Sequence, residues 1–114
     1  QDQLFKFIDS SFSEIKFIFF QSNHEGLIID TLHEHKNVVD GIILNVGALS
    51  HYSYAIRDAI KAINIPTIEV HLSNINERES FRRNLVLSDA CFDTIFGKGK
   101  QGYIDAVNKL KDMD

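Results

Sequence analysis

The chain has 114 residues, of which 44% are hydrophobic and 25% charged, and its net charge is −4. These values predict one soluble globular domain over residues 1–114, with a single hydrophobic core. The negative charge argues against a general attraction to nucleic acid or to an anionic membrane surface. No apolar run approaches the roughly 20 residues that a membrane-spanning helix needs.

The first half of the chain alternates predicted helices with predicted strands. Residues 1–12 carry apolar side chains on one helical stripe, and residues 27–36 repeat the spacing of three and four. Between them, residues 15–20 are almost continuously apolar, which is typical of a strand covered on both faces. Residues 41–45 predict a second buried strand, which ends in the small-residue turn 46–48.

The second half continues the alternation. Residues 53–63 predict an amphipathic helix, and the β-branched residues within 67–71 predict a strand. Residues 76–83 predict a charged loop or short helix, and a last strand at 91–96 and a last helix at 102–110 follow. Strands alternating with helices predict an α/β fold, in which a parallel sheet has helices on both faces.

Polar residues follow the predicted strands where these end. Because the carboxyl ends of parallel strands meet at one sheet edge, we expect Asn45, His71 and Ser73 to surround a ligand site there. Glu69 and His71 are two apart in a strand and therefore point the same way, so the carboxylate can orient the imidazole and set its tautomer. The pair predicts acid/base chemistry, while a His–Glu pair that only ties the strand edge together is the alternative.

Several basic residues lie beside these strand ends. His51 directly precedes a predicted helix, whose N-terminal amides favour an anion, although a histidine that only caps the helix is equally open. Arg78, Arg82 and Arg83 follow the last of the polar strand ends along the chain. One of them could reach an anionic or hydroxylated ligand, although a solvated charge run is the usual structure for such a sequence.

Three other patterns predict structure rather than chemistry. The stretch 97–102 fits G-x-G-x-x-G but lacks a later strand with an acidic residue, so we predict a close-packed turn instead of a dinucleotide site. His33 and His35 are two apart in a helix and do not share a face, which argues against a metal site. The single cysteine, Cys91, begins a predicted strand, which predicts an inert core thiol, and its lack of a disulfide partner suits a reducing cytosol.

With these segments in place, the chain resembles type II 3-dehydroquinate dehydratase, a flavodoxin-like enzyme of the shikimate pathway. The matching stretches follow the family's order and spacing and cover nearly the whole chain: 19–26, 40–45, 47–51, 55–59, 65–74, 78–82 and 97–103.

The resemblance implies the anti elimination of water from 3-dehydroquinate, through an enolate, to 3-dehydroshikimate. This is a hydro-lyase reaction that needs no metal and no other cofactor. In it, His71 would be the general acid that protonates the departing hydroxyl, and Glu69 would orient it. The side chains of Asn45, His51 and Arg82 would bind substrate hydroxyls. The backbone amides of Leu72 and Ser73 would hold the substrate carboxylate.

The resemblance also implies an assembly and a location. Family members form trimers that assemble into dodecamers, so Asp58 would reach the site of a neighbouring subunit. We expect a cytoplasmic enzyme whose partner is its small-molecule substrate. The other hypothesis is a non-catalytic, flavodoxin-like ligand-binding or assembly protein derived from the same family.

Some features of the family have no match in this sequence. Its first strand and the loop that follows, with a catalytic arginine and a tyrosine base, are not matched by any stretch. Tyr52, Tyr54 and Tyr103 do not lie in a motif that corresponds to that base. Since the chain begins with Gln1 instead of methionine, we expect the domain to be incomplete at its N-terminus.

Overall fold

The sheet of this protein has three parallel strands. The computed structural model describes residues 2–113, and the strands are β1 (Ile42–Leu44), β2 (Thr67–His71) and β3 (Asp93–Phe96). They lie in the order β1-β2-β3, with Ile43 beside Ile68 in the first pair. The predicted strands at 41–45, 67–71 and 91–96 are therefore confirmed, although β3 begins two residues later than expected.

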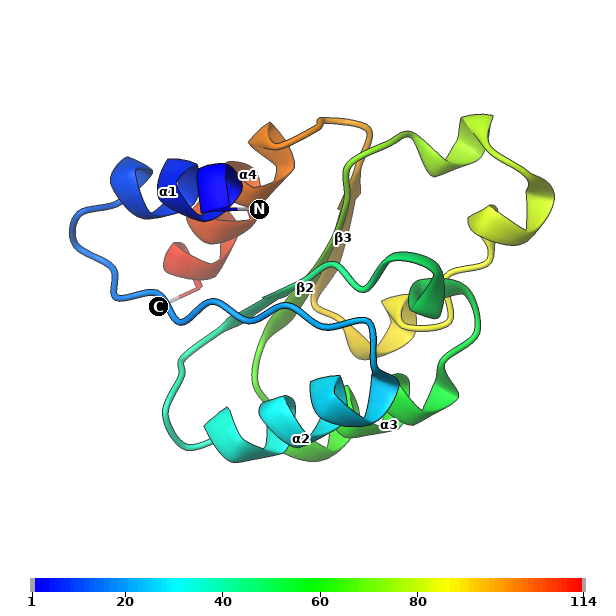
Figure 1. Cartoon of the computed structure of the whole chain (residues 1–114), viewed down its shortest axis with the longest axis horizontal. Helices are drawn as coiled ribbons and strands as arrows, with labels where there is room; N and C mark the ends of the chain where they lie inside the picture. Colours follow the sequence, from blue (N-terminus) through cyan, green and yellow to red (C-terminus); the bar gives the residue numbers. More distant parts are fainter. Residues whose placement is uncertain (1, 114) are drawn as a thin grey trace.

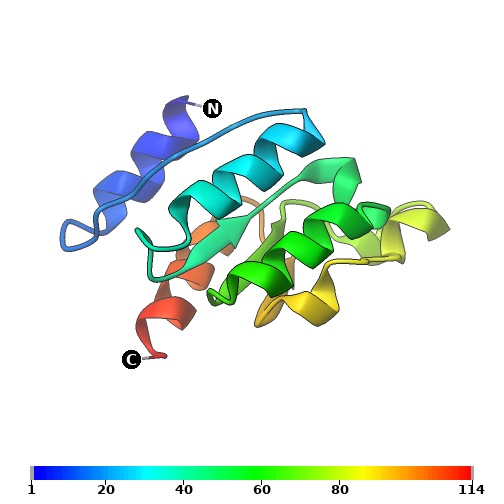
Figure 2. The ribbon, with the colours of Figure 1, turned by 90° about the horizontal axis from the view of Figure 1, so that it is seen from below.

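Four α-helices flank the sheet on both faces (Figure 1). Helices α2 (Glu25–His35) and α3 (Tyr54–Ile63) pack side by side on one face, as Figure 2 also shows. Helix α4 (Gln101–Lys111) covers the other face, and α1 (Asp2–Ser11) packs against it. This arrangement confirms the predicted α/β class. No helix within residues 2–113 is long and apolar enough to span a membrane.

Strand β2 is buried along its whole length, because it lies between the other two strands and between the two helical layers. Ile68 and Val70 pack with Ile95 and Ala106 on the side of α4. The alternate side chains of β2, those of Thr67, Glu69 and His71, therefore face the layer of α2 and α3. Three polar residues thus lie on the inner face of a buried strand.

Helix α4 approaches the sheet closely at Gly102. A Cβ on this residue would lie 3.2 Å from Val70 Cγ1 and 3.4 Å from Ile95 Cγ2, so a side chain would crowd the contact. Gly97 and Gly99 precede the helix with φ of +80° and +55°, a conformation that favours glycine. The predicted close-packed glycine turn is confirmed.

We expect Gly102→Ala to destabilise the fold by about 1 kcal/mol, because overpacking costs about 1–3 kcal/mol and alanine gains only ~0.5–1 kcal/mol in a helix. The β-branched side chains of Val70 and Ile95 are buried and have little freedom to move aside. The matched control is Gly26→Ala in α2, where nothing lies within 4 Å of an added Cβ and no loss is expected. Urea unfolding measures both changes, and a more stable Gly102→Ala protein would contradict the prediction.

Residues 15–20 do not form the predicted strand. They are extended, but within the described chain no backbone–backbone hydrogen bond joins residues 16–22 to another segment. Figures 1 and 2 show this segment passing on the β1 side of the sheet, between the helical layers. A strand needs the backbone of a neighbouring strand as its hydrogen-bond partner. Among residues 2–113, no strand pairs with residues 15–20 or with the outer edge of β1.

Aromatic contacts hold this extended segment against α1. Phe19 stacks on Phe5 with ring centroids 4.4 Å apart, and Phe17 stacks on Phe19 at 5.6 Å. The alternate side chains point away from α1, since Ile18 and Phe20 are each 49% exposed. The segment is therefore covered on one side only, and the expectation of burial on both faces is wrong.

Candidate active site

A cavity of about 350 Å³ lies at the carboxyl edge of the sheet. The end of β1, the 3₁₀ helix η1 (Gly47–His51), the end of β2 and the segment after it contribute its lining. The lining residues include six that the sequence singles out for substrate binding or catalysis, namely Asn45, His51, His71, Leu72, Ser73 and Arg82, together with Arg78. The strand-end argument therefore located the cavity correctly.

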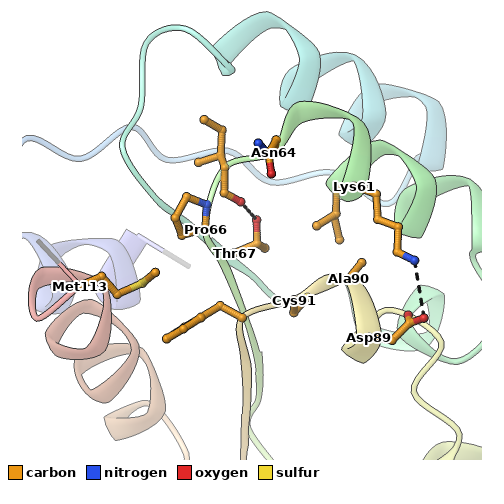
Figure 3. A pocket seen from close by; sticks show the side chains of 11 residues that line it. Lys61, Asn64, Pro66, Thr67, Asp89, Ala90, Cys91 and Met113 are labelled. Atoms are coloured by element: carbon orange, nitrogen blue, oxygen red, sulfur yellow. Dashed lines mark hydrogen bonds and ion pairs between the residues drawn. The ribbon is translucent and has the colours of Figure 1, made fainter.

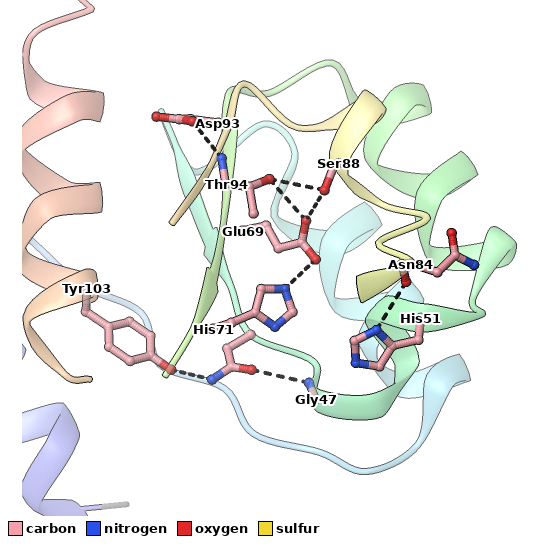
Figure 4. A network of polar contacts seen from close by, with 10 residues as sticks. Gly47, His51, Glu69, His71, Asn84, Ser88, Asp93, Thr94 and Tyr103 are labelled. Atoms are coloured by element: carbon pink, nitrogen blue, oxygen red, sulfur yellow. Dashed lines mark hydrogen bonds and ion pairs between the residues drawn. The ribbon is translucent and has the colours of Figure 1, made fainter. Parts of the chain in front are cut away.

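Glu69 and His71 form a buried pair at the wall of this cavity (Figure 4). Glu69 is fully buried and His71 is 7% exposed. The Nε2 atom of His71 lies 2.8 Å from Oε2 of Glu69. Because a carboxylate oxygen accepts, Nε2 carries the proton of this hydrogen bond, and Nδ1 is left to face the cavity.

His51 lies beside His71, with its ring centroid 6.2 Å away. Its Nδ1 donates to the backbone oxygen of Asn84 at 3.1 Å, which leaves Nε2 for a ligand. The cap of α3 is Ser53, whose side-chain oxygen accepts from the amide of Ile56 at 3.1 Å. The alternative in which His51 caps the helix is therefore wrong.

The amide of Asn45 is held in one orientation. Its Nδ2 donates to the Tyr103 hydroxyl at 2.8 Å, and its Oδ1 accepts from the backbone N–H of Gly47 at 3.2 Å. Gly47 has φ of +58°, so the turn after β1 depends on glycine at this position. A substrate hydroxyl would meet an amide group that needs no reorientation.

The turn after β2 presents free amides to the cavity. The carbonyl oxygens of Leu72 and Ser73 accept from the amides of Gly99 at 3.0 Å and Gly97 at 3.1 Å, which anchors the turn. Within residues 2–113, the amides of Leu72 and Ser73 themselves donate to no protein acceptor. Two neighbouring free N–H groups can hold an oxyanion such as a carboxylate.

The arginines differ in their positions. Arg78 lines the cavity and donates from Nη1 to the Ser73 hydroxyl at 3.2 Å. Arg82 also lines it, while its Nε donates to Glu79 at 2.5 Å and lowers the pKa of that carboxyl group. Arg83 is exposed outside the cavity. Of the three candidates, two are therefore placed to contact a ligand.

Asp58 lies outside the cavity. Its side chain is 75% exposed on α3 and lies 3.4 Å from Arg57. This position gives Asp58 no contact with the ligand site of its own chain. A role in the site of a neighbouring subunit remains a prediction.

Three residues from distant segments contact residues of the candidate site, and the sequence patterns did not identify them. Ser88 and Thr94 donate to Glu69, and Tyr103 accepts from Asn45, 58 positions away in the chain. The polar residues Asp93 and Thr94 inside the predicted strand 91–96 were the one signal that could have drawn attention to this group.

A second cavity, of about 390 Å³, lies at the opposite edge of the sheet (Figure 3). It contains Cys91, Lys61 and Asp89, and the last two are paired at 3.8 Å. Burial raises the pKa of Cys91 to about 12, so the thiol stays protonated and the prediction of an inert cysteine is supported. Because this cavity lacks an acid/base pair like Glu69–His71, the carboxyl-edge cavity is the candidate active site.

Known proteins resemble this chain in sequence and in structure. The family described as Dehydroquinase class II matches residues 2–111. The 3-dehydroquinate dehydratase of Caldicellulosiruptor saccharolyticus is 58% identical over 97 residues, which cover 84% of this chain and 67% of that protein. The protein of the same name from Bacillus mycoides is 62% identical over 84 residues, which cover 74% of this chain and 58% of that protein.

A solved structure shows the same fold. The crystal structure of the type II dehydroquinase from Butyrivibrio crossotus superposes with a TM-score of 0.92 and 45% identity, over 96% of this chain and 79% of that one. Together, the comparisons show that this chain spans between about three fifths and two thirds of the curated relatives it matches.

Proposed function

Because this chain belongs to the class II dehydroquinase family, we propose that it acts as a 3-dehydroquinate dehydratase. The reaction removes water from 3-dehydroquinate by anti elimination, through an enolate, and yields 3-dehydroshikimate. The observation that carries the proposal is the buried Glu69–His71 pair, whose free ring nitrogen faces a cavity lined by the free amides of Leu72 and Ser73.

In this proposal, His71 supplies the acid step. Glu69 holds Nε2 of the ring, so that protonated His71 donates from Nδ1 to the departing hydroxyl. The leaving group then departs as water instead of hydroxide.

The other residues of the cavity bind and orient the substrate. The amides of Leu72 and Ser73 hold its carboxylate, while Asn45 and His51 meet its hydroxyls. Arg82 contacts a ring hydroxyl from its place in the cavity lining. No tyrosine lines the cavity among the described residues, so the proposal assigns this chain's lining the acid step and substrate binding.

The assembly and location are proposed on the same basis. We propose that the protein works in the cytoplasm, as trimers assembled into a dodecamer, with Asp58 contacting a neighbouring copy. The exposed side chains of Asp58, Tyr52 and Tyr54 on or next to α3 support a contact there. Light scattering that reported a monomer would contradict this part of the proposal.

The test is a direct assay with 3-dehydroquinate. The product contains a carbon–carbon double bond conjugated with a carbonyl, so its ultraviolet absorbance reports turnover. We expect saturable turnover that survives borohydride in the presence of substrate, because no lysine lines the described cavity to form a Schiff base. Substrate binding without turnover would instead support the ligand-binding hypothesis, which no observation on the described residues favours at present.

A further inference from the structure

Two hydroxyl groups contact the carboxylate of Glu69 on the side away from His71 (Figure 4). Ser88 Oγ lies 2.9 Å from Oε1 of Glu69, and Thr94 Oγ1 lies 3.3 Å from the same oxygen. The two hydroxyls are 3.2 Å from each other. The acid step described above does not use either of them, and neither lines the cavity.

The fold brings these hydroxyls together for identifiable reasons. Thr94 is the register partner of Glu69 in the parallel pair of β2 and β3, so their side chains lie on the same face. Ser88 begins the 3₁₀ helix η4 (Ser88–Ala90), which packs against α3 on that face. The two groups therefore come from different elements and meet at one carboxylate oxygen.

The hydrogens of this cluster can be followed one by one. Thr94 can donate to Oε1 of Glu69 or to Ser88 Oγ, and in the second case Ser88 donates to Oε1. Oε1 thus receives at least one hydroxyl hydrogen in either arrangement, while Oε2 receives the Nε2 hydrogen of His71. Each oxygen of the buried carboxylate therefore receives at least one hydrogen from the protein, which matters because an unpaired buried charge is costly.

We propose that Ser88 and Thr94 are positioning residues that hold Oε1 of Glu69, and thereby keep Oε2 on Nε2 of His71 and Nδ1 directed at the cavity. The terminal torsion of a glutamate side chain is soft, so a carboxylate without the Oε1 partners would rotate. The ring of His71 would then sample the other tautomer. The effect on turnover rests on the proposed function, whereas the effect on the tautomer does not.

The first measurement is kinetic and uses the double variant Ser88→Ala/Thr94→Val. We expect kcat to fall about tenfold, the factor that corresponds to one net hydrogen bond, while KM changes by less than about twofold. The matched control is Thr67→Val, a buried threonine on the same face of β2 whose hydroxyl donates to the backbone oxygen of Ile65 at 2.9 Å and not to Glu69. The conservative variant Thr94→Ser keeps the hydroxyl and is expected to retain the parent kcat.

The second measurement is the ¹⁵N chemical shift of the His71 ring nitrogens, with His71→Ala used to assign the signals. We expect one neutral tautomer, protonated at Nε2, in the parent and in Thr67→Val, and a mixture in the double variant. Thr94→Val alone changes little volume, so it provides a folded test protein if the double variant does not fold. In Thr94→Val, too, we expect part of the His71 ring to change to the other neutral tautomer.

The outcomes separate this inference from the proposed function. An unchanged tautomer and an unchanged kcat in a folded Thr94→Val or double variant would overturn the inference, even if the parent turns over substrate. A parent without turnover, but with a tautomer that shifts in the variants, would support the inference and overturn the proposed function. A drop in kcat that Thr67→Val also shows would mean that the loss is structural, and would overturn it too.

Discussion

Replacing His71 with alanine is expected to lower kcat for the dehydration roughly 10²–10⁴-fold, the usual contribution of a general acid, while substrate affinity changes little. The reason is that, among the described residues that line the cavity, only His71 has a ring held by a buried carboxylate, with its second nitrogen facing the cavity. The residues proposed to bind the substrate carboxylate and hydroxyls stay in place. Steady-state kinetics, together with calorimetric titration of a substrate analogue, measure the two effects separately.

Two companion variants sharpen this result. His33→Ala removes an exposed histidine of α2, so its activity is expected to match the parent. Glu69→Gln keeps the size of the side chain but replaces one acceptor oxygen of the carboxylate with an NH2 donor. A comparable loss of kcat is expected, because the tautomer of the His71 ring is disturbed. Parent-like activity of His71→Ala would show that the His–Glu pair only ties the strand edge together.

Ile68→Ala is expected to lower the free energy of unfolding by about 2–5 kcal/mol, the usual cost of truncating a buried isoleucine. Ile68 is fully buried in the central strand and packs with Val70, Ile95 and Ala106 beneath α4. The strands and α4 are anchored by many other contacts, so the resulting cavity cannot collapse completely. Such a loss is a large part of a typical domain stability of roughly 5–15 kcal/mol.

The control for this change is Val38→Ala after α2, where the side chain is 65% exposed. Its free energy of unfolding is expected to lie within about 0.5 kcal/mol of the parent. Denaturant titration of the three proteins provides the comparison. Equal losses for Ile68→Ala and Val38→Ala would show that β2 is not the centre of the core.

Local patterns in the sequence were sufficient for most of the secondary structure. Apolar spacing of three and four predicts all four α-helices to within two residues at either end, because a helix buries one stripe of its own surface. The carboxyl-edge rule then places Asn45, His71 and Ser73 around one cavity, since parallel strands all end on the same side. The pairing of Glu69 with His71 follows from their separation of two in a strand.

Other features were decided only by contacts between distant segments. Residues 15–20 have the composition of a buried strand, yet the chain around them supplies aromatic partners and no backbone ladder within the described residues, so they stay extended without being a strand.

The sequence by itself therefore determined the four α-helices, the three strands of the sheet, the edge where the candidate site lies and the pairing of Glu69 with His71, because each depends on neighbours a few residues apart. The tertiary structure alone decided which hydroxyls hold Glu69, and that Tyr103 orients Asn45. It also showed that His51 lines the cavity at the carboxyl edge, while Ser53 caps α3. The physical reason is that a side-chain hydrogen bond depends on distance and direction in space, and strand register and helix packing set both.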